Sequence, residues 1–239
     1  KFLKKEEAKK IFTRPQGFSK GDILIQKNLA KTLTRISQQG REAFYSGETA
    51  KKISSFFQEN EGFLSLEDLN QYRVRILKPV CGNYRNYKVC SMAPPSSGGI
   101  ALIQILNILE NIDLSELGHN SEKYVKILIS AMDYAYKDRA KYLGDPNFYK
   151  VPQDLLTSKK YAEKIYQLIQ RNKLPSKVDV SITESEETTH FSIVDKWGNV
   201  VSNTYTLNTA YGSGIVPTGT GILMNNEMDD FSSKPGYPN

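Results

Sequence analysis

The chain has 239 residues, of which 39% are hydrophobic and 24% are charged, a composition typical of a globular protein with a core of ordinary size. Its net charge of +6 comes from 32 basic and 26 acidic residues that are spread along the chain, so we expect no nucleic-acid partner. No apolar run reaches the roughly 18 residues that a membrane-spanning helix needs, so we also expect no membrane span.

The first third of the chain predicts helices. Charged residues mixed along 2–12 indicate a short, solvated helix end. Apolar residues at helical spacing predict two core-facing helices, one over 25–36 that stops at Gly40 and one over 50–57 that stops at Gly62. Ser65 and the aspartate three positions later predict the start of another helix, with a capping box.

A strand-rich segment follows over 75–92. Its residues 84–87 indicate a hairpin with a two-residue loop and Asn86 at a positive φ. That register places Cys81 opposite Cys90, the only two cysteines of the chain. Two unrelated buried thiols are an equally good interpretation at this point.

Three further helices are predicted before residue 175. The turn at 94–99 favours an N-cap, rather than an anion site, for a buried helix over 100–109. A second helix ends near Gly144 and Pro146, and a third covers about 158–169. The apolar face of the second helix consists of Val125, Leu128, Ile129, Met132, Ala135 and Tyr136.

The most informative stretch begins after a polar segment, 176–187, that has the composition of an exposed linker. Beyond it, apolar and polar residues alternate on both sides of 196–198, which predicts a β-hairpin. If Asp195 and Asn199 close the loop, Thr188 faces Thr206 and their hydroxyls come within hydrogen-bonding reach. The alternative is that these threonines are only strand formers.

A flexible linker that leads into a threonine at the start of a strand is what an N-terminal nucleophile hydrolase requires. In such enzymes the precursor cuts itself, and the new terminal residue supplies both the hydroxyl nucleophile and the α-amine that activates it. The reference pKa of that amine, about 7.7 to 8.0, suits this task near neutral pH.

Other chemistries are less well supported. His119, His190 and the two cysteines cannot assemble the usual zinc sets, so we expect neither a metal nor another cofactor. No Gly-x-Ser-x-Gly turn is present for a serine hydrolase. His190 shares a strand face with Thr188, and we expect it to be a packed strand residue.

The chain resembles the γ-glutamyltranspeptidases of bacterial type, because several of their motifs occur in the family's order. These motifs are Pro-Pro-Ser-Ser-Gly-Gly at 94–99, Tyr-Leu-Gly-Asp-Pro at 142–146, Thr-Thr-His at 188–190, Asp-Lys-Trp-Gly-Asn at 195–199, Thr-Tyr-Thr-Leu-Asn at 204–208 and Asn-Asn-Glu-Met-Asp-Asp-Phe at 225–231. The resemblance implies an α+β fold, part of the αββα sandwich of N-terminal nucleophile hydrolases. It also implies that 1–175 ends a large subunit, 176–187 is a processing linker and 188–239 begins a small subunit.

Residue roles follow from the same resemblance. Thr188 would be the nucleophile, and Thr206 would orient the Thr188 hydroxyl. The processing site would be the bond from Glu187 to Thr188. Three residues match positions that hold the α-amino and α-carboxyl groups of the glutamyl unit: Asn208, Glu227 and Asp230. The family suggests export, and in an exported chain a disulfide between Cys81 and Cys90 is feasible.

The implied activity is γ-glutamyl transfer and hydrolysis of glutathione-like amides, with an amino acid, a peptide or water as acceptor. The implied location is the periplasm or the exterior. The alternatives are an acylase or poly-γ-glutamate depolymerase of the same superfamily, and an inactive binding module with the same fold. With neither an initiating Met nor a signal peptide, Lys1 is expected to begin a trimmed fragment. Relative to the family this fragment lacks segments at both ends, so we expect it to be inactive alone.

Overall fold

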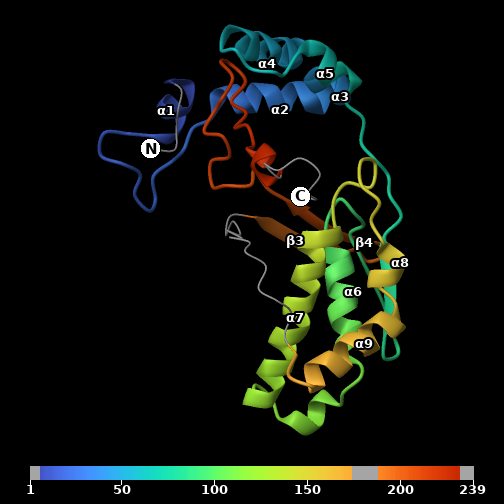
Figure 1. Ribbon diagram of the computed structural model, residues 1–239. Coiled ribbons are helices and arrows are strands. Elements are labelled where there is room, and N and C mark those ends of the chain that lie inside the picture. The colour runs from blue at the N-terminus through green and yellow to red at the C-terminus, as the bar shows by residue number, and fades with distance from the viewer. Residues whose placement is uncertain (1–5, 174–187, 232–239) are drawn as a thin grey trace. The chain divides into compact units, whose positions relative to one another are not determined.

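The computed structural model describes residues 6–173 and 188–231 (Figure 1). These form two compact units, one made of 6–74 with 188–229 and the other of 75–173 with 230–231. The predicted linker 176–187, including Glu187, lies outside the described residues. Within the described ranges, no helix is long and apolar enough to cross a membrane.

The first unit contains the predicted N-terminal helices and one short helix that was not predicted, Arg41–Tyr45. They are α1 (Glu6–Phe12), α2 (Lys27–Gln39), α3 (Arg41–Tyr45), α4 (Glu48–Glu59) and α5 (Leu66–Gln71). A small core of Ala50, Ile53 and Leu69 holds α4 and α5 together, and Ile222 and Met224 pack against it. The capping box is confirmed, since the Ser65 hydroxyl accepts a hydrogen bond from Asp68 N–H and the Asp68 carboxylate accepts one from Ser65 N–H.

The inward face of α2 differs from the prediction. Leu33 is 55% exposed and Ile25 precedes the helix, whereas Thr32 is fully buried. The Thr32 hydroxyl donates to the backbone carbonyl of Thr220 at 2.8 Å. The backbone around Gly221 also approaches α2 so closely that a Cβ there would lie 2.3 Å from Leu29 N. This face of α2 therefore packs against polar backbone, where the hydroxyl of Thr32 can form a hydrogen bond that an apolar side chain could not.

The hairpin of the first unit has the predicted register. Strands β3 (Thr189–Val194) and β4 (Val200–Tyr205) are antiparallel. The Asp195 carboxylate accepts hydrogen bonds from the backbone of Trp197 and Asn199, each at 2.9 Å, and from the Asn199 side chain at 2.8 Å. The Asn199 side chain, followed by these backbone donors, lowers the pKa of Asp195. This loop closes the hairpin and so sets which residues face each other.

The second unit is a helical layer with a hairpin on it. Strands β1 (Val80–Tyr84) and β2 (Tyr87–Ser91) form the hairpin. The helices are α6 (Gly98–Leu109), η1 (Leu114–Leu117), α7 (Glu122–Tyr142), α8 (Gln153–Leu156) and α9 (Lys159–Gln170). The apolar helix α6 packs against α7, α9 and β1, and α7 and α9 also contact each other (Figure 1). The strands described here thus form two separate two-stranded sheets.

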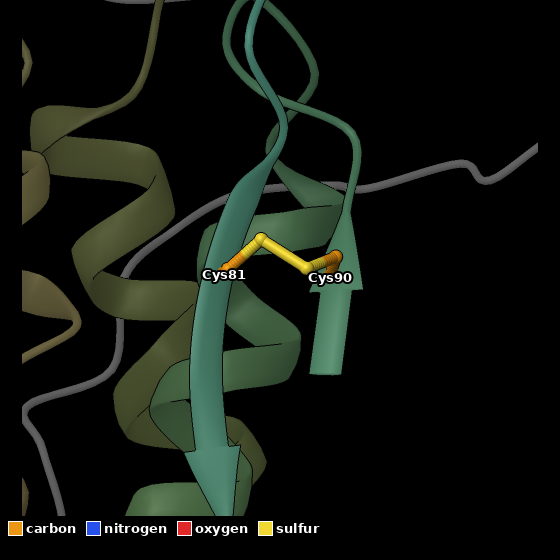
Figure 2. Close-up of a disulfide and its surroundings, with 2 residues drawn as sticks. All are labelled: Cys81 and Cys90. Carbon is orange, nitrogen blue, oxygen red and sulfur yellow. A yellow bond between two sulfur atoms is a disulfide. The ribbon is translucent and has the colours of Figure 1, made fainter. Parts of the chain in front are cut away.

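The β1–β2 hairpin carries a disulfide between Cys81 and Cys90, which are directly paired (Figure 2). The S–S distance is 2.12 Å and the Cα atoms are 4.1 Å apart. Both residues are exposed, so the alternative of two buried thiols is wrong. At the loop, Arg85 rather than Asn86 has the positive φ, 52°.

Two helix predictions need correction. Ser97 makes no side-chain capping bond; its hydroxyl accepts from Arg139 Nε at 3.0 Å, and the neighbouring Ser96 hydroxyl accepts from Gly98 N–H at 3.4 Å. On α7, Val125 is 38% exposed, Ile129 52% and Met132 40%, although all three were predicted to face the core. The buried residues of α7 are Ile127, Ser130, Ala131, Ala135 and Asp138.

The polar side chains on the buried face of α7 have hydrogen-bond partners, so this face can be buried without leaving polar groups unpaired. The Ser130 hydroxyl donates to the carbonyl of Lys126 at 2.7 Å. The Asp138 carboxylate accepts from Gln104 Nε2 at 2.6 Å and from the Tyr161 hydroxyl at 2.9 Å. Asp138 therefore links α7 to α6 and α9.

Candidate active site

Thr188 stands immediately before β3 and opposite Thr206, just beyond the end of β4. The Thr188 hydroxyl donates to Thr206 Oγ1 at 3.3 Å. Side chains alternate between the two faces of a strand, so the even-numbered residues of this hairpin share one face. The two hydroxyls therefore meet because the three-residue loop sets the register.

Thr206 is itself held in place by the backbone that follows it. Its Oγ1 accepts a second hydrogen bond, from Asn208 N–H at 2.9 Å. Asn208 has a φ of 73°, a conformation that Asn tolerates better than most residues. The chain turns at this residue, and the Asn208 side chain donates to the carbonyl of Asn226 at 3.3 Å.

Asn226 connects this turn to the segment that follows the long loop 209–225. Its backbone N–H donates to Leu207 O at 3.1 Å, and its side-chain Oδ1 accepts from Thr209 N–H at 3.2 Å and from the Thr209 hydroxyl at 3.0 Å. A Cβ at Gly212 would lie 2.3 Å from Met224 O, which shows how closely the loop returns. Sequence reasoning did not single out Thr209 and Asn226, and the only signal for Asn226 was its place in the motif at 225–231.

The two predicted substrate-binding acids lie in a short 3₁₀ helix, η2 (Glu227–Asp230). Glu227 directly follows Asn226, is half-buried, and its N–H donates to Asn225 Oδ1 at 3.0 Å. Asp230 is exposed at the end of η2 and does not belong to the hydrogen-bonded group of Thr188, Thr206, Asn208 and Asn226. The structure thus brings Thr188, Thr206 and Asn208 together. Glu227 directly follows Asn226, which is hydrogen-bonded to Asn208.

His190 is exposed, so the prediction of a packed strand residue is wrong. Its Nδ1 lies 2.7 Å from Thr204 Oγ1, and its Nε2 lies 3.2 Å from Ser202 Oγ and 3.3 Å from Ser192 Oγ. The imidazole therefore bridges both strands on the face that carries Thr188. Three successive cross-strand pairs on this face, beginning with Thr188 and Thr206, are wholly polar.

The described ranges contain no group of three or more His, Cys, Asp or Glu residues that could hold a metal ion. The hydrogen-bonded group around Thr188 consists of hydroxyl and amide groups, supplied by Thr206, Asn208 and Asn226.

Comparison with known proteins identifies the family of the chain. The chain matches the Gamma-glutamyltranspeptidase family over residues 1–239. The glutathione hydrolase proenzyme of Escherichia coli (strain K12) is 48% identical over 240 residues, which cover 98% of this chain and 41% of that protein. The crystal structure of Helicobacter pylori gamma-glutamyltranspeptidase is 47% identical with a TM-score of 0.68, covering 71% of this chain and 49% of that one. Cephalosporin acylase from Bacillus halodurans is 28% identical with a TM-score of 0.81, covering 96% and 41%.

Fold and relatives together define the class as N-terminal nucleophile hydrolases, with an α+β fold. Within that class, the chain belongs to the γ-glutamyltranspeptidase family. It spans about two fifths of the length of the curated relatives that it matches, 41% of one and 40% of another.

Proposed function

We propose that the complete protein transfers γ-glutamyl groups from glutathione-like amides to amino acids, peptides or water. The observation that carries the proposal is the hydrogen bond of 3.3 Å between the Thr188 and Thr206 hydroxyls at the start of the β3–β4 hairpin. It is supported by relatives named glutathione hydrolase proenzyme.

The reaction has two steps. The hydroxyl oxygen of Thr188 attacks the γ-carbonyl carbon of the donor, the α-amine of Thr188 takes the hydroxyl proton, and the C–N bond breaks as the leaving amine is protonated. The result is a γ-glutamyl ester on Thr188. An acceptor amine or water then attacks the ester carbonyl, and the hydroxyl of Thr188 is restored. Thr206 Oγ1, fixed by Asn208 N–H, holds the attacking hydroxyl in position.

The α-amine becomes available only if the chain is cut before Thr188. We infer that Thr188 itself attacks the carbonyl of Glu187, which gives an ester that water opens. The large and small subunits, 1–175 with its linker 176–187 and 188–239, are then the two products of one precursor. The exposed position of Thr188 leaves its oxygen open to a carbonyl carbon.

Recognition of the glutamyl unit is assigned to Asn208, Glu227 and Asp230. The carboxylates suit the α-ammonium because a charge-assisted hydrogen bond is about twice as strong as a neutral one. Asn226 is a positioning residue, since it joins Asn208 to the segment that carries both acids.

The cephalosporin acylase structure makes an acylase the second candidate. A γ-glutamyl anilide and a glutaryl anilide differ only in the α-ammonium group. Comparing the rates at which the complete protein cleaves them distinguishes a γ-glutamyltransferase from an acylase. We expect the complete protein to release aniline chromophore from the γ-glutamyl compound at an enzyme's ordinary rate, roughly 1 to 10³ per second, and far more slowly from the glutaryl compound. Equal rates would favour the acylase, and no release from either would favour an inactive binding module.

We also propose a periplasmic or secreted location. The disulfide between Cys81 and Cys90 supports it, because disulfides persist in oxidising compartments. Fractionation of cells that make the complete protein, with marker enzymes for each compartment, tests this proposal.

A further inference from the structure

The Cys81–Cys90 disulfide lies on the face of its hairpin that points away from the core of its own unit. Cys81, Asn83, Lys88 and Cys90 are all exposed, whereas Val80 is buried and Gly82 and Val89 are half-buried. Alternation along both strands therefore puts the sulfurs and the packing residues on opposite faces. Figure 2 shows the bond crossing between the two strands.

The inner face anchors the hairpin without help from the disulfide. Val80 belongs to a core cluster with Ile100, Ile103, Leu143 and Leu156. A Cβ at Gly82 would lie 2.7 Å from Ile103 Cγ2, so this strand sits directly on α6.

The loop end of the hairpin is held a second time, by polar groups. Lys159 Nζ donates to Asn83 O at 2.5 Å and is paired with Glu110, whose carboxylate also accepts from Arg85 N–H. The Lys159 side chain, followed by the Arg85 backbone, lowers the pKa of Glu110, so the carboxylate is charged at neutral pH. The attachments at both ends of the hairpin would survive if the S–S bond opened.

The surroundings favour an anionic partner for the sulfurs. Residues 80–91 include Arg85 and Lys88 and no Asp or Glu. Alternation places Lys88 on the same face as Cys90, two residues away. A nearby cation stabilises the thiolate that attacks a disulfide and the one that leaves it. Exposed disulfides belong to the labile class, and the short sequence separation of 9 makes this one a modest stabiliser.

We propose that Cys81–Cys90 is a reversible exchange site for an anionic small-molecule thiol, opened and closed while the protein stays folded. A thiolate attacks one sulfur, the S–S bond breaks, and the other cysteine leaves as a thiolate that takes a proton from water. A second small thiol attacks the mixed disulfide and releases the second cysteine. Two electrons thus pass to the protein, and the two small thiols become one disulfide.

Glutathione is the thiol that the proposed function would bring to the protein, and only this choice of thiol rests on that function. It is anionic at neutral pH because its two carboxylates outnumber its one ammonium. A neutral thiol such as 2-mercaptoethanol is the matched reagent, since it carries out the same exchange without the charge.

The test uses the oxidised complete protein in excess reduced thiol, quenched with acid and alkylated, with the cysteine peptides read by mass spectrometry. We expect both cysteines to be alkylated under native conditions, with the far-UV circular dichroism unchanged, and the bond to re-form in oxidised glutathione. If the cysteines react only in denaturant, the proposal is overturned. A Cys81→Ala/Cys90→Ala protein should fold and give a cooperative thermal transition, and its failure to fold would equally overturn the proposal.

Three variants define the chemistry further. Lys88→Glu should slow exchange with glutathione by roughly 3- to 10-fold at low salt and exchange with 2-mercaptoethanol much less. Lys20→Glu, with the same charge change in an exposed loop, should match the parent; a loss as large as that of Lys88→Glu would contradict a local role for Lys88. Thr188→Ala should exchange at the parental rate. A protein that exchanges but releases no γ-glutamyl anilide would refute only the proposed function.

Discussion

Thr206 differs from the other threonines of its hairpin because its oxygen receives hydrogen bonds from two directions, the Thr188 hydroxyl and Asn208 N–H. Under the proposed mechanism, Thr206→Ala removes the group that positions the attacking hydroxyl of Thr188 and leaves the proposed contacts to the glutamyl unit. We expect kcat to fall by roughly 10²-fold and KM to change less.

Thr206→Ser keeps the hydroxyl and should recover most of the rate. Thr204→Ala is the matched control, since Thr204 lies on the same face of the hairpin, two residues before Thr206. Steady-state kinetics of the complete, processed protein with a γ-glutamyl anilide measure all three. If Thr206→Ala matched the parent, Thr206 would be only a strand former.

Asp230 is exposed, so its replacement leaves no buried group without a partner in the free protein. In the complex, Asp230→Ala would leave the substrate ammonium partly unpaired, at a cost of about 1 to 3 kcal/mol. The expected result is a higher KM for γ-glutamyl donors with self-processing intact. The neighbouring Asp229→Ala serves as the control. An unchanged KM in processed Asp230→Ala protein would remove Asp230 from the site.

Asp138 on α7 makes the packing of three helices depend on pH. Burial is the main influence and raises its pKa, although the hydrogen bonds from Gln104 and Tyr161 act in the opposite direction. A carboxyl group whose pKa is higher in the folded state adds stability that is complete below the unfolded value, about 3.9, and is lost as pH rises through the folded value. Asp138→Asn cannot ionise and should not show this loss.

Thermal unfolding between pH 4 and pH 7 tests this expectation. The parent should lose Tm relative to Asp138→Asn as the pH rises through the window above about 3.9. Asp133→Asn, an exposed change on the same helix, should follow the parent. Parallel curves for the parent and Asp138→Asn would show that the buried carboxyl does not control the pH dependence.

Helix α6 begins at a glycine pair whose members have different surroundings. A Cβ at Gly99 would lie 2.1 Å from Met92 O, whereas one at Gly98 would have only Ser96 Oγ nearby, at 3.7 Å. Gly99→Ala therefore forces backbone apart and should destabilise the protein by about 1 to 3 kcal/mol. Gly98→Ala should be neutral or slightly stabilising. Chemical denaturation of both variants tests the pair, and equal effects would contradict the close approach.

Local sequence patterns predicted the helices and hairpins better than they predicted which side of each helix is buried. Alternation and a short loop were enough for the register of both hairpins, because one loop length allows only one pairing. The buried face of α7 was misjudged because its polar members, Ser130 and Asp138, are paired inside the unit. Thr32 on α2 was missed for the same reason, since its partner Thr220 lies far along the chain.

At the scale of the whole molecule, the family can be inferred from several sequence motifs that occur in the family's order. How the candidate site residues are brought together depends on contacts between distant segments, which no local sequence pattern contains. The pair of Thr188 and Thr206 could be predicted, since both lie on one hairpin. The bonds of Asn226 to Asn208 and Thr209 could not, because the loop 209–225 must first fold back on itself. These bonds bring Asn226, and with it the next residue Glu227, to the end of the hairpin that carries Thr188.

The central claim is that Thr188 becomes the N-terminal nucleophile of the complete protein. Intact-mass measurement of aged, purified protein tests it most directly. The account predicts two pieces, the smaller beginning with Thr188, and an uncleaved chain for Thr188→Ala. A protein that remains a single chain, a cut at another bond, or normal cleavage in Thr188→Ala would contradict it.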